Sequence, residues 1–408
     1  MKIKNNLLVL TQWSFKDPLI QTYTLPYVEI IRRILPPSSS IIVITAEQPH
    51  MALTEEEKKK INAEWAEKNM ELYTLSYKRY GIRKLISFAG QFISLLRLIK
   101  RKKADVIHAI CTPAGAIGFL LSKATGRPLV IDSFEPHAEA MVENGTWKKT
   151  GFAYRVLFRL ERWQAKRATY IIAAAAGMKE YALKKYNTDI SGKMFVKGAC
   201  VDFKNFYPRP KDPRLLKELG LENKIVGIYA GKLGGIYHES EVFDFIRFCY
   251  DHWGEKFSML MLTSTKREEL EMRMKSAGVP VHVLTSRFVS HPEVPAYMSL
   301  ADFGLTPVKP VPTKKYCTPI KDGEYWAMGL PVVITPGISD DSEIIAQENI
   351  GVVVDLRQKE LFKEAVRKLD LLLSENKEQL RKKIVSVAMQ YRSFTIPEKI
   401  YPAIYAAG

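Results

Sequence analysis

The sequence has few cysteines, no long apolar run and no pattern typical of a metal site. Its four cysteines, Cys111, Cys200, Cys249 and Cys317, are far apart and lack Cys-x-x-Cys spacing. Neither a metal site nor a disulfide framework is therefore predicted, and a reducing cytoplasm fits best. No window approaches the roughly 18 uncharged apolar residues of a membrane-spanning helix. The apolar run 7–10 is too short for a signal peptide, and we interpret it as a first buried strand.

Acidic residues are scarce in the first half of the chain. Residues 1–200 carry 32 Lys+Arg and 17 Asp+Glu, which gives a charge of +15. Residues 201–408 carry 29 Lys+Arg and 27 Asp+Glu, which gives +2, and the two halves together give the net charge of +17. This asymmetry predicts an anionic partner for the first half only. A nucleic-acid-binding protein is a distant alternative, because the basic residues are not part of a nucleic-acid-binding motif.

Strand-like and helix-like segments alternate along all 408 residues, which are 47% hydrophobic and 26% charged. This length suggests two domains, and this alternation predicts an α/β fold with doubly wound parallel sheets. The proline- and charge-rich segment 201–213 interrupts the alternation and is interpreted as a linker. The predicted domains are 1–200 and 201–389, and the aromatic tail 390–408 is expected to pack back on the first.

The element boundaries follow from apolar periodicity and from proline and glycine positions. The predicted strands are 7–10, 41–45, 104–110, 129–131, 170–174, 225–230, 258–263 and 332–334. The predicted helices are 23–35, 77–103, 155–168, 178–186, 239–250 and 266–277, and a charge-rich segment 54–70 is expected to be a solvated helix.

The segment 318–334 reads as a short helix that leads into a buried strand. Pro319 suits a first helical turn, Gly329 suits the left-handed position that ends a helix, and Pro331 prevents its continuation. Lys321 and Glu324 are three residues apart and share one face at the helix start. A cation and free backbone N–H groups are thereby placed where a phosphate binds, with a carboxylate one turn away.

The same segment has the pattern Pro-x-Lys-x-x-Glu-Tyr-x-Ala-x-Gly-Leu-Pro-Val-Val over 319–333, followed by Ser-Glu-Ile-Ile at 342–345 and by Gly351. It resembles the nucleotide-sugar signature of the family 4 retaining glycosyltransferases. The resemblance implies the GT-B fold, in which two Rossmann-like domains face a cleft. It also implies transfer of a hexose-type sugar from a UDP- or GDP-type nucleotide sugar to an acceptor hydroxyl, with no cofactor and no metal.

The resemblance also implies roles for individual residues of the second half. Lys321 would contact the diphosphate, Glu324 the ribose, and Arg287 would lie near the nucleobase. The glycine turn after strand 225–230 would approach the diphosphate. The donor-binding candidates are Gly231, Lys232, Gly234, Arg287, Thr318, Lys321 and Glu324. The family's first glutamate falls on Tyr316, so its substitute is left open among Asp322, Thr318 and residues 310–315.

In the first half, strand 129–131 resembles the family's strand that ends in a catalytic-region histidine. Phe134 falls on that histidine's position, so the resemblance leaves Glu135 and His137, the nearest polar residues, as the catalytic candidates. The acceptor or membrane candidates are Trp13, Arg83, Lys84, Lys100, Arg101 and Lys102. The basic charge predicts approach to an anionic membrane. The expected acceptor is a lipid-linked sugar or polysaccharide in cell-envelope synthesis, with the protein in the cytoplasm, in part on the inner face of the plasma membrane. A GT-B nucleotide-sugar epimerase is the alternative enzyme.

Overall fold

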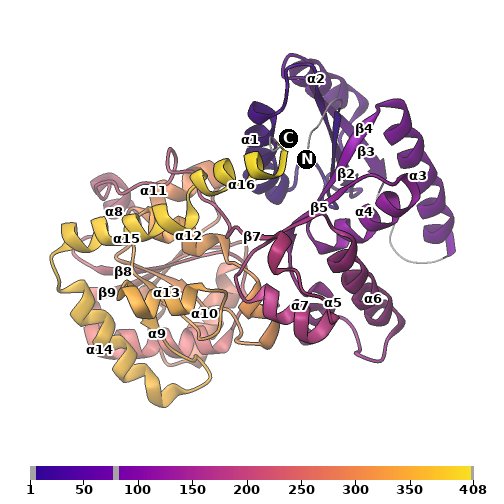
Figure 1. Ribbon diagram of the computed structural model, residues 1–408. Coiled ribbons are helices and arrows are strands. Elements are labelled where there is room, and N and C mark those ends of the chain that lie inside the picture. Colours follow the sequence, from indigo (N-terminus) through magenta and orange to yellow (C-terminus); the bar gives the residue numbers. More distant parts are fainter. Residues whose placement is uncertain (1–5, 77–81, 406–408) are drawn as a thin grey trace. The chain divides into compact units, whose positions relative to one another are not determined.

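The computed structural model describes residues 6–76 and 82–405, and gives no side chains for residues 82–88. The chain forms two compact units (Figure 1). Unit 1 comprises Met1–Lys197 and Thr395–Gly408, and unit 2 comprises Gly198–Phe394. Each unit is a parallel sheet with helices packed against it, so each has a hydrophobic core of its own.

The sheet of unit 1 has seven strands in the order β3-β2-β1-β4-β5-β6-β7. Every pairing between these strands is parallel. Strands buried on both faces are apolar along their whole length, and residues 7–10 of β1 are fully buried. The strands are β1 (Asn6–Leu10), β2 (Ser40–Glu47), β3 (Met70–Ser76), β4 (Ala104–Ile110), β5 (Leu129–Phe134), β6 (Tyr170–Ala173) and β7 (Met194–Val196).

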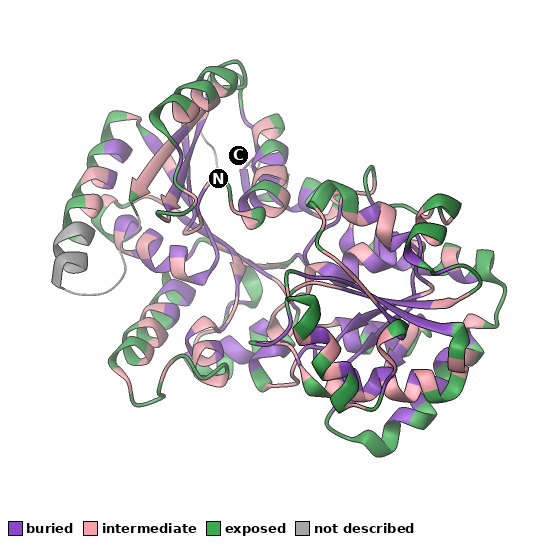
Figure 2. Cartoon of the chain, turned by 180° about the vertical axis from the view of Figure 1, so that it is seen from behind, coloured by how far each residue is buried: buried purple, intermediate pink, exposed green. Residues whose placement is uncertain are grey.

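Most helices of unit 1 bury one side and expose the other (Figure 2). They are α1 (Leu25–Ile34), α2 (Glu55–Ala66), α3 (Ile82–Arg101), α4 (Thr112–Thr125), α5 (His137–Glu143), α6 (Phe152–Arg167), α7 (Met178–Tyr186) and α16 (Thr395–Tyr405). The charge-rich α2 begins at a capping box formed by Thr54 and Glu57, and it contains no buried residue. The expected solvated helix is therefore confirmed.

The C-terminal helix α16 belongs to unit 1, where it packs against α1. The Tyr401 hydroxyl donates a hydrogen bond of 2.7 Å to Asp132 Oδ2 at the end of β5, and the Tyr405 hydroxyl pairs with His108 Nδ1. Asp132 also lies 3.0 Å from the Lys197 ammonium, and both side chains are fully buried. Burial opposes the charged form, but Lys197, His108 Nε2 at 3.5 Å and the Tyr401 hydroxyl stabilise the carboxylate, so the pKa of Asp132 is lowered.

The sheet of unit 2 has six parallel strands in the order β10-β9-β8-β11-β12-β13. They are β8 (Ile225–Ala230), β9 (Phe257–Leu262), β10 (Leu284–Arg287), β11 (Phe303–Thr306), β12 (Val332–Ile334) and β13 (Gly351–Val353). The helices are α8 (Pro213–Leu219), α9 (Ser240–Trp253), α10 (Arg267–Ser276), α11 (Val294–Met298), α12 (Ile320–Ala327), α13 (Asp341–Glu348), α14 (Phe362–Leu373) and α15 (Lys377–Arg392).

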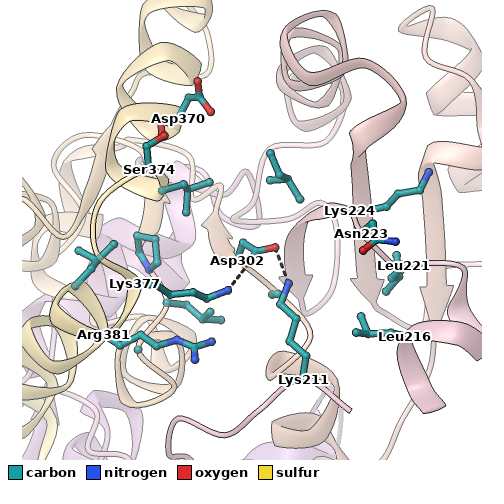
Figure 3. Close-up of a pocket in the computed structure, with 17 residues that line it drawn as sticks. Lys211, Leu216, Leu221, Asn223, Lys224, Asp302, Asp370, Ser374, Lys377 and Arg381 are labelled. Atoms are coloured by element: carbon teal, nitrogen blue, oxygen red, sulfur yellow. Dashed lines mark hydrogen bonds and ion pairs between the residues drawn. The ribbon is translucent and has the colours of Figure 1, made fainter. Parts of the chain in front are cut away.

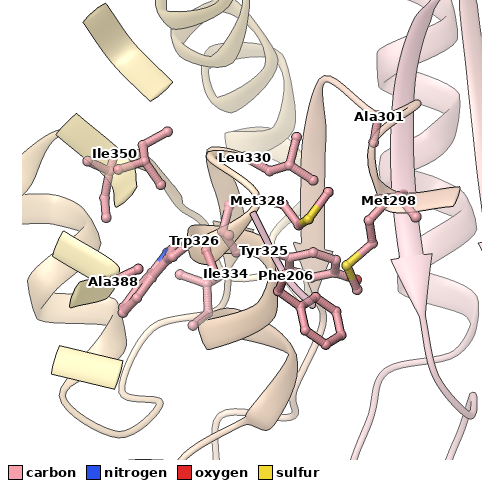
Figure 4. Packing of buried hydrophobic residues seen from close by; sticks show 14 of the residues in the cluster. Phe206, Met298, Ala301, Tyr325, Trp326, Met328, Leu330, Ile334, Ile350 and Ala388 are labelled. Atoms are coloured by element: carbon pink, nitrogen blue, oxygen red, sulfur yellow. The ribbon is translucent and has the colours of Figure 1, made fainter. Parts of the chain in front are cut away.

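Helix α12 lies in the middle of the larger core cluster of unit 2, where its Tyr325 and Trp326 are fully buried (Figure 4). Gly304 of β11 lies beneath the Tyr325 ring, because a Cβ at this position would be 2.6 Å from the ring carbons. Fully burying a large apolar side chain stabilises a fold by about 1.5–3 kcal/mol. These two aromatic side chains therefore hold α12, and with it Lys321 and Glu324, at a fixed place on the sheet.

The predicted fold class of two Rossmann-like parallel sheets is confirmed by these two strand orders. The strands predicted above do not include β3, β7, β10, β11 or β13, which are short or lie beside charged segments. The helix predicted over 23–35 begins at Leu25, after a π-helical turn at Leu19–Thr24. Of the helix predicted over 77–103, residues 77–81 lie outside the described residues.

Candidate functional site

A cavity of about 290 Å³ lies beyond the carboxyl ends of β8, β9 and β10 in unit 2. Open parallel sheets bind their ligands at this edge. Its lining residues come from the loops that follow these strands and from α12. They are Ala230, Gly231, Lys232, Leu262, Thr263, Ser264, Phe288, Val289, His291, Val294 and Glu324. Three predicted donor-binding residues, Gly231, Lys232 and Glu324, therefore meet at one cavity.

Lys321 lies in the first turn of α12, directly behind the wall of this cavity. Its ammonium is 4.3 Å from the centre of the Tyr229 ring and 4.1 Å from that of Tyr237. The ammonium makes no hydrogen bond within the described residues, and the side chain is only 7% exposed. Burial lowers the pKa of Lys321 to about 8, against the attraction of Asp322 and Glu324.

Gly231 separates the Lys321 ammonium from the cavity. The residue has a φ of +146°, and a Cβ at this position would lie 2.8 Å from Lys321 Nζ. A side chain here would be strained and would push the ammonium away, so a glycine is required. The lysine's charge is thus held immediately beneath a backbone that faces the cavity, although Lys321 itself does not line it.

The other two residues of the glycine turn have different environments. Lys232 is exposed at the rim of the cavity, and its carbonyl accepts a 2.6 Å hydrogen bond from the Tyr229 hydroxyl. Gly234 has a φ of +79°, and a Cβ there would lie 2.0 Å from Glu239 Oε1. Gly234 therefore allows the turn to pack on Glu239, and it is not among the residues that line the cavity.

Glu324 is oriented by a histidine that sequence reasoning missed. His291 Nε2 lies 3.2 Å from Glu324 Oε1, and the Glu324 side chain is largely buried whereas that of His291 is half exposed. This hydrogen bond raises the pKa of His291, because the carboxylate favours the charged imidazole. His291 lies in a 3-10 turn capped by Ser290 and Glu293. The sequence offered only this capping pattern, which says nothing about Glu324, 33 residues further along.

Arg287 and Phe288 lie in an adjoining hollow of about 380 Å³, together with Thr263, Ser264 and Thr265. Phe288 lines both the hollow and the cavity, and its side chain is 79% exposed. An exposed aromatic ring at the mouth of a polar cavity is suited to stacking on a planar base. Arg287 donates a 3.1 Å hydrogen bond to the Ser286 carbonyl and lies 4.0 Å from Glu218.

The candidates considered for the missing first glutamate lie away from the cavity. Thr318 pairs with Ser339 through their hydroxyl groups at 3.2 Å. Asp322 is fully buried and contacts Thr306 and Asp341, and Arg392 pairs with Asp341. Burial and the neighbouring carboxyl group of Asp341 raise the pKa of Asp322. Asp322 is therefore part of the buried interior of unit 2, and it does not take the place of the family's first glutamate at the cavity.

In unit 1, the two predicted catalytic residues lie together at the carboxyl end of β5. His137 Nδ1 is 3.4 Å from Glu135 Oε1, and both side chains are partly exposed. The backbone of Glu135 is fixed by Thr112, whose hydroxyl donates to its carbonyl at 2.7 Å and accepts from its N–H at 3.0 Å. Trp13 follows β1, and its carbonyl accepts a 3.1 Å hydrogen bond from the Ala46 N–H.

The basic candidates of unit 1 lie in or beside α3. Lys100 and Arg101 are exposed in its last turn, whereas Lys102 forms an ion pair with Glu71. The side chains of Arg83 and Lys84 lie outside the described residues. Among residues 6–76 and 82–405, no helix is long and apolar enough to cross a membrane. The same residues contain no group of three or more His, Cys, Asp or Glu that could hold a metal ion.

Comparisons with known proteins agree with this architecture. Residues 71–189 match the family model described as a glycosyl transferase 4-like domain. Sequence comparison with curated proteins finds no match. HepE of Anabaena, solved with UDP, superposes with a TM-score of 0.72 at 13% identity and covers 99% of this chain and 100% of its own.

Two further structures give the same result. HepE with UDP-glucose has a TM-score of 0.71 at 14% identity, covering 98% of this chain and 100% of its own. WaaG, a glycosyltransferase involved in lipopolysaccharide biosynthesis, has a TM-score of 0.66 at 16% identity, covering 98% of this chain and 100% of its own. These comparisons show that the chain has the GT-B fold of the superposed structures. Segment 71–189 matches the glycosyl transferase 4-like model, so the predicted resemblance is confirmed in this segment and in the fold. The signature at 319–333 lies outside the matched segment.

Proposed function

We propose that the protein transfers a hexose from a nucleoside-diphosphate sugar, of the UDP type, to an acceptor hydroxyl with retention of configuration. The observation that carries the proposal is the buried ammonium of Lys321, which has no hydrogen-bond partner among the described residues. It lies directly behind Gly231, at a cavity that also contains Glu324. Similar chains bind such ligands, since HepE has been solved with UDP and with UDP-glucose.

In the proposed complex the diphosphate lies against the glycine turn after β8. Lys232 contacts it from the rim, and Lys321 approaches it when its side chain rotates from between Tyr229 and Tyr237 or when the turn at Gly231 moves. The two cations neutralise the charge that develops on the leaving diphosphate. Glu324 accepts hydrogen bonds from the ribose hydroxyls while His291 holds its other oxygen, and Phe288 stacks on the base.

The residues that line the cavity bear on how a retaining transfer would proceed. Among the described lining residues Glu324 is the one carboxylate, and His291 already occupies one of its oxygens. A covalent glycosyl-enzyme needs a free carboxylate nucleophile. We therefore favour displacement on the same face of the sugar, assisted by the leaving phosphate, without a metal ion. NMR detection of the anomeric configuration of the first-formed product tests this, and an inverted product would refute it.

The donor proposal is tested by isothermal titration with UDP, GDP, ADP and UDP-sugars. Lys321→Ala and Glu324→Ala are each expected to weaken UDP binding at least tenfold, because each removes a contact to a charged or fully hydrogen-bonded group. Lys363→Ala, at an exposed position of α14, is the matched control and should bind as the unaltered protein does. Equal UDP binding by all four proteins, or binding by none, would exclude this site.

We further propose that unit 1 approaches an anionic membrane through α6, in support of a lipid-linked or polysaccharide acceptor in cell-envelope synthesis. Phe152, Val156 and Trp163 lie on one face of this helix and are 81%, 39% and 43% exposed. Exposed arginines and lysines flank them: Arg155, Arg159, Arg162, Lys166 and Arg167. An interfacial helix combines apolar side chains, which insert into the membrane, with cations, which attract the lipid headgroups.

A hollow of about 500 Å³ beside this helix adds to the proposed surface. It is lined by Phe119, Lys123, Trp163, Lys166 and Arg167, so aromatic rings and cations face the same space. Phe119 and Trp163 stack with their ring centres 5.8 Å apart. The proposed surface on α6 differs from the α3 cluster expected from the sequence.

Vesicle sedimentation tests the membrane proposal. Binding to vesicles with phosphatidylglycerol is expected to exceed binding to neutral vesicles and to decrease with salt. Phe152→Ser combined with Trp163→Ser is expected to abolish it, whereas Leu371→Ser combined with Met389→Ser, which changes exposed apolar residues of unit 2, should leave it unchanged. Binding that is independent of anionic lipid refutes the proposal.

A GT-B nucleotide-sugar epimerase is a second candidate, because Glu135 and His137 form an acid–base pair in unit 1. Such an enzyme would use the same donor cavity but release a free sugar nucleotide. Incubation with UDP-sugars and no acceptor separates the two functions. An epimerised UDP-sugar would identify the epimerase, and an unchanged UDP-sugar that is consumed only when an acceptor is added would identify the transferase.

A further inference from the structure

Unit 2 has a second cavity of about 430 Å³ at the amino ends of β8, β11 and β12 (Figure 3). Ile225, Ala301 and Pro331 line it where these strands begin. Because the strands are parallel, this edge of the sheet is opposite to the one that carries the donor cavity. The nucleotide-sugar function does not use any residue of this second cavity.

Two lysines pair with one carboxylate in this cavity, which Arg381 and Lys224 also line. Asp302 Oδ2 lies 2.7 Å from Lys211 Nζ, and Oδ1 lies 3.2 Å from Lys377 Nζ. Oδ2 also accepts a 3.0 Å hydrogen bond from the Val226 N–H. In Figure 3 the two lysines reach Asp302 from different sides, and Arg381 lies beside Lys377. The carboxylate thus neutralises one of these cations and leaves an excess of positive charge.

Arg381 makes no hydrogen bond or ion pair within the described residues, and its Nε atom is buried without a partner. Its stem crosses Gly329, where a Cβ would lie 3.1 Å from Arg381 Cγ. The glycine has a φ of +72° and ends α12, so this close approach is built into the chain. Burial lowers the pKa of Lys211, and the nearby charges of Lys377 and Arg381 act in the same direction. An anion would relieve this repulsion.

The rest of the cavity is mainly apolar. Its walls include Leu216, Leu221, Leu330, Leu373 and Leu380. The other acid in the lining, Asp370, is already bound by the Trp253 indole N–H at 2.8 Å and by His252 at 3.1 Å. The cavity volume lies within the range of small-molecule sites, which combine apolar walls with a few polar groups that fix the ligand's orientation.

We propose that this cavity binds the phosphate group of a small organic phosphate monoester, whose apolar portion packs against the leucines. Arg381 and Lys377 bind the phosphate oxygens, and Lys211 remains paired with Asp302. The ion pairs of Asp302 by themselves have a structural use, since they join the segment before α8 and the start of α15 to β11. That use explains neither the unpaired guanidinium nor the open volume beside it.

The proposal is tested by isothermal titration of the protein saturated with UDP, or of the Lys321→Ala protein, so that the donor cavity does not contribute. The probes are phenyl phosphate and inorganic phosphate, with phenol as the uncharged control. We expect phenyl phosphate to bind more tightly than inorganic phosphate and phenol not to bind. Lys377→Gln combined with Arg381→Gln is expected to weaken phenyl phosphate binding at least tenfold.

Lys382→Gln combined with Lys383→Gln is the matched control, because it removes the same charge from exposed positions of the same helix. This variant is expected to bind phenyl phosphate as the unaltered protein does. Inorganic phosphate binding as tightly as phenyl phosphate would overturn the monoester assignment and identify a site for free phosphate. No binding of either anion, or equal loss of binding in both double variants, would overturn the site itself. Circular dichroism and retained UDP binding show that the variants are folded.

Discussion

Replacing Lys321 with methionine is expected to make the free protein more stable while removing its affinity for UDP. The ammonium is buried between Tyr229 and Tyr237 without a hydrogen-bond partner. The difference between the ordinary pKa of 10.5 and about 8 corresponds to a cost of about 3 kcal/mol for the charged form. Attraction to the two rings is not part of that cost and offsets up to about 2 kcal/mol of it.

The expected net gain in the free energy of unfolding for Lys321→Met is therefore about 1–2 kcal/mol near pH 7, where methionine fills a similar volume. For a domain of this size, each kcal/mol raises the melting temperature by about 2–4 °C. Calorimetry of the free protein measures this shift. Lys232→Met, at an exposed lysine of the same site, is the control and should leave the melting temperature unchanged.

The pH dependence gives the prediction a sign. Between about pH 8 and 10.5 the unfolded chain binds more protons at Lys321 than the folded chain does, so the stability of the unaltered protein rises with pH in this window. A bound diphosphate favours the charged lysine, so UDP affinity should fall above pH 8, by at most about tenfold per pH unit. Both dependences should be absent from Lys321→Met. A less stable Lys321→Met protein, or one that binds UDP normally, would refute the reasoning.

Three other side chains give predictions of the same kind. Burial raises the pKa of Glu161 to about 8, so the folded state keeps the carboxyl proton at pH values where the unfolded chain has lost it. The free energy of unfolding should therefore fall as pH rises from about 4.5 to 8, by at most about 1.4 kcal/mol per pH unit. Calorimetry of Glu161→Gln should show a weaker dependence of stability on pH. His291→Ala should weaken UDP binding about fivefold in titration, because one hydrogen bond of about 1 kcal/mol to Glu324 is lost, and His291→Gln should restore most of it. Asp132→Asn breaks a buried ion pair and should destabilise unit 1 by about 3–5 kcal/mol. Limited proteolysis should then cleave the chain next to α16 sooner than in the unaltered protein. An unchanged rate of cleavage would show that the carboxylate does not anchor this helix.

Much of the local structure could be predicted because it depends on residues close in sequence. Met178–Tyr186 and Ile225–Ala230 begin and end at the residues expected from their periodicity. Pro319 stands immediately before α12, and Gly329 takes the left-handed conformation with a φ of +72°. Short strands such as Gly351–Val353 were missed because three residues are too few to show a period. Their pairing in the sheet, rather than their own sequence, makes them strands.

The contents of the donor cavity were predictable only in part. The signature around α12 predicted that Lys321 and Glu324 would lie near a glycine turn from another part of the chain, and Gly231 does lie against Lys321. The signature did not predict that two tyrosine rings would enclose the ammonium. It also gave no sign that His291 would bind Glu324, because the capping residues around His291 are satisfied locally.

The sequence alone determined the alternation of strands and helices, the limits of α12 and the uneven charge of the two halves, since each depends on neighbouring residues or on a simple count. The tertiary structure decided which side chains meet. Lys321 lies between Tyr229 and Tyr237, and Lys211 and Lys377 share Asp302 although they are 166 residues apart along the chain. Whether such groups are paired, and therefore whether their pKa values shift, depends on packing of the sheet and its helices, which no local pattern encodes.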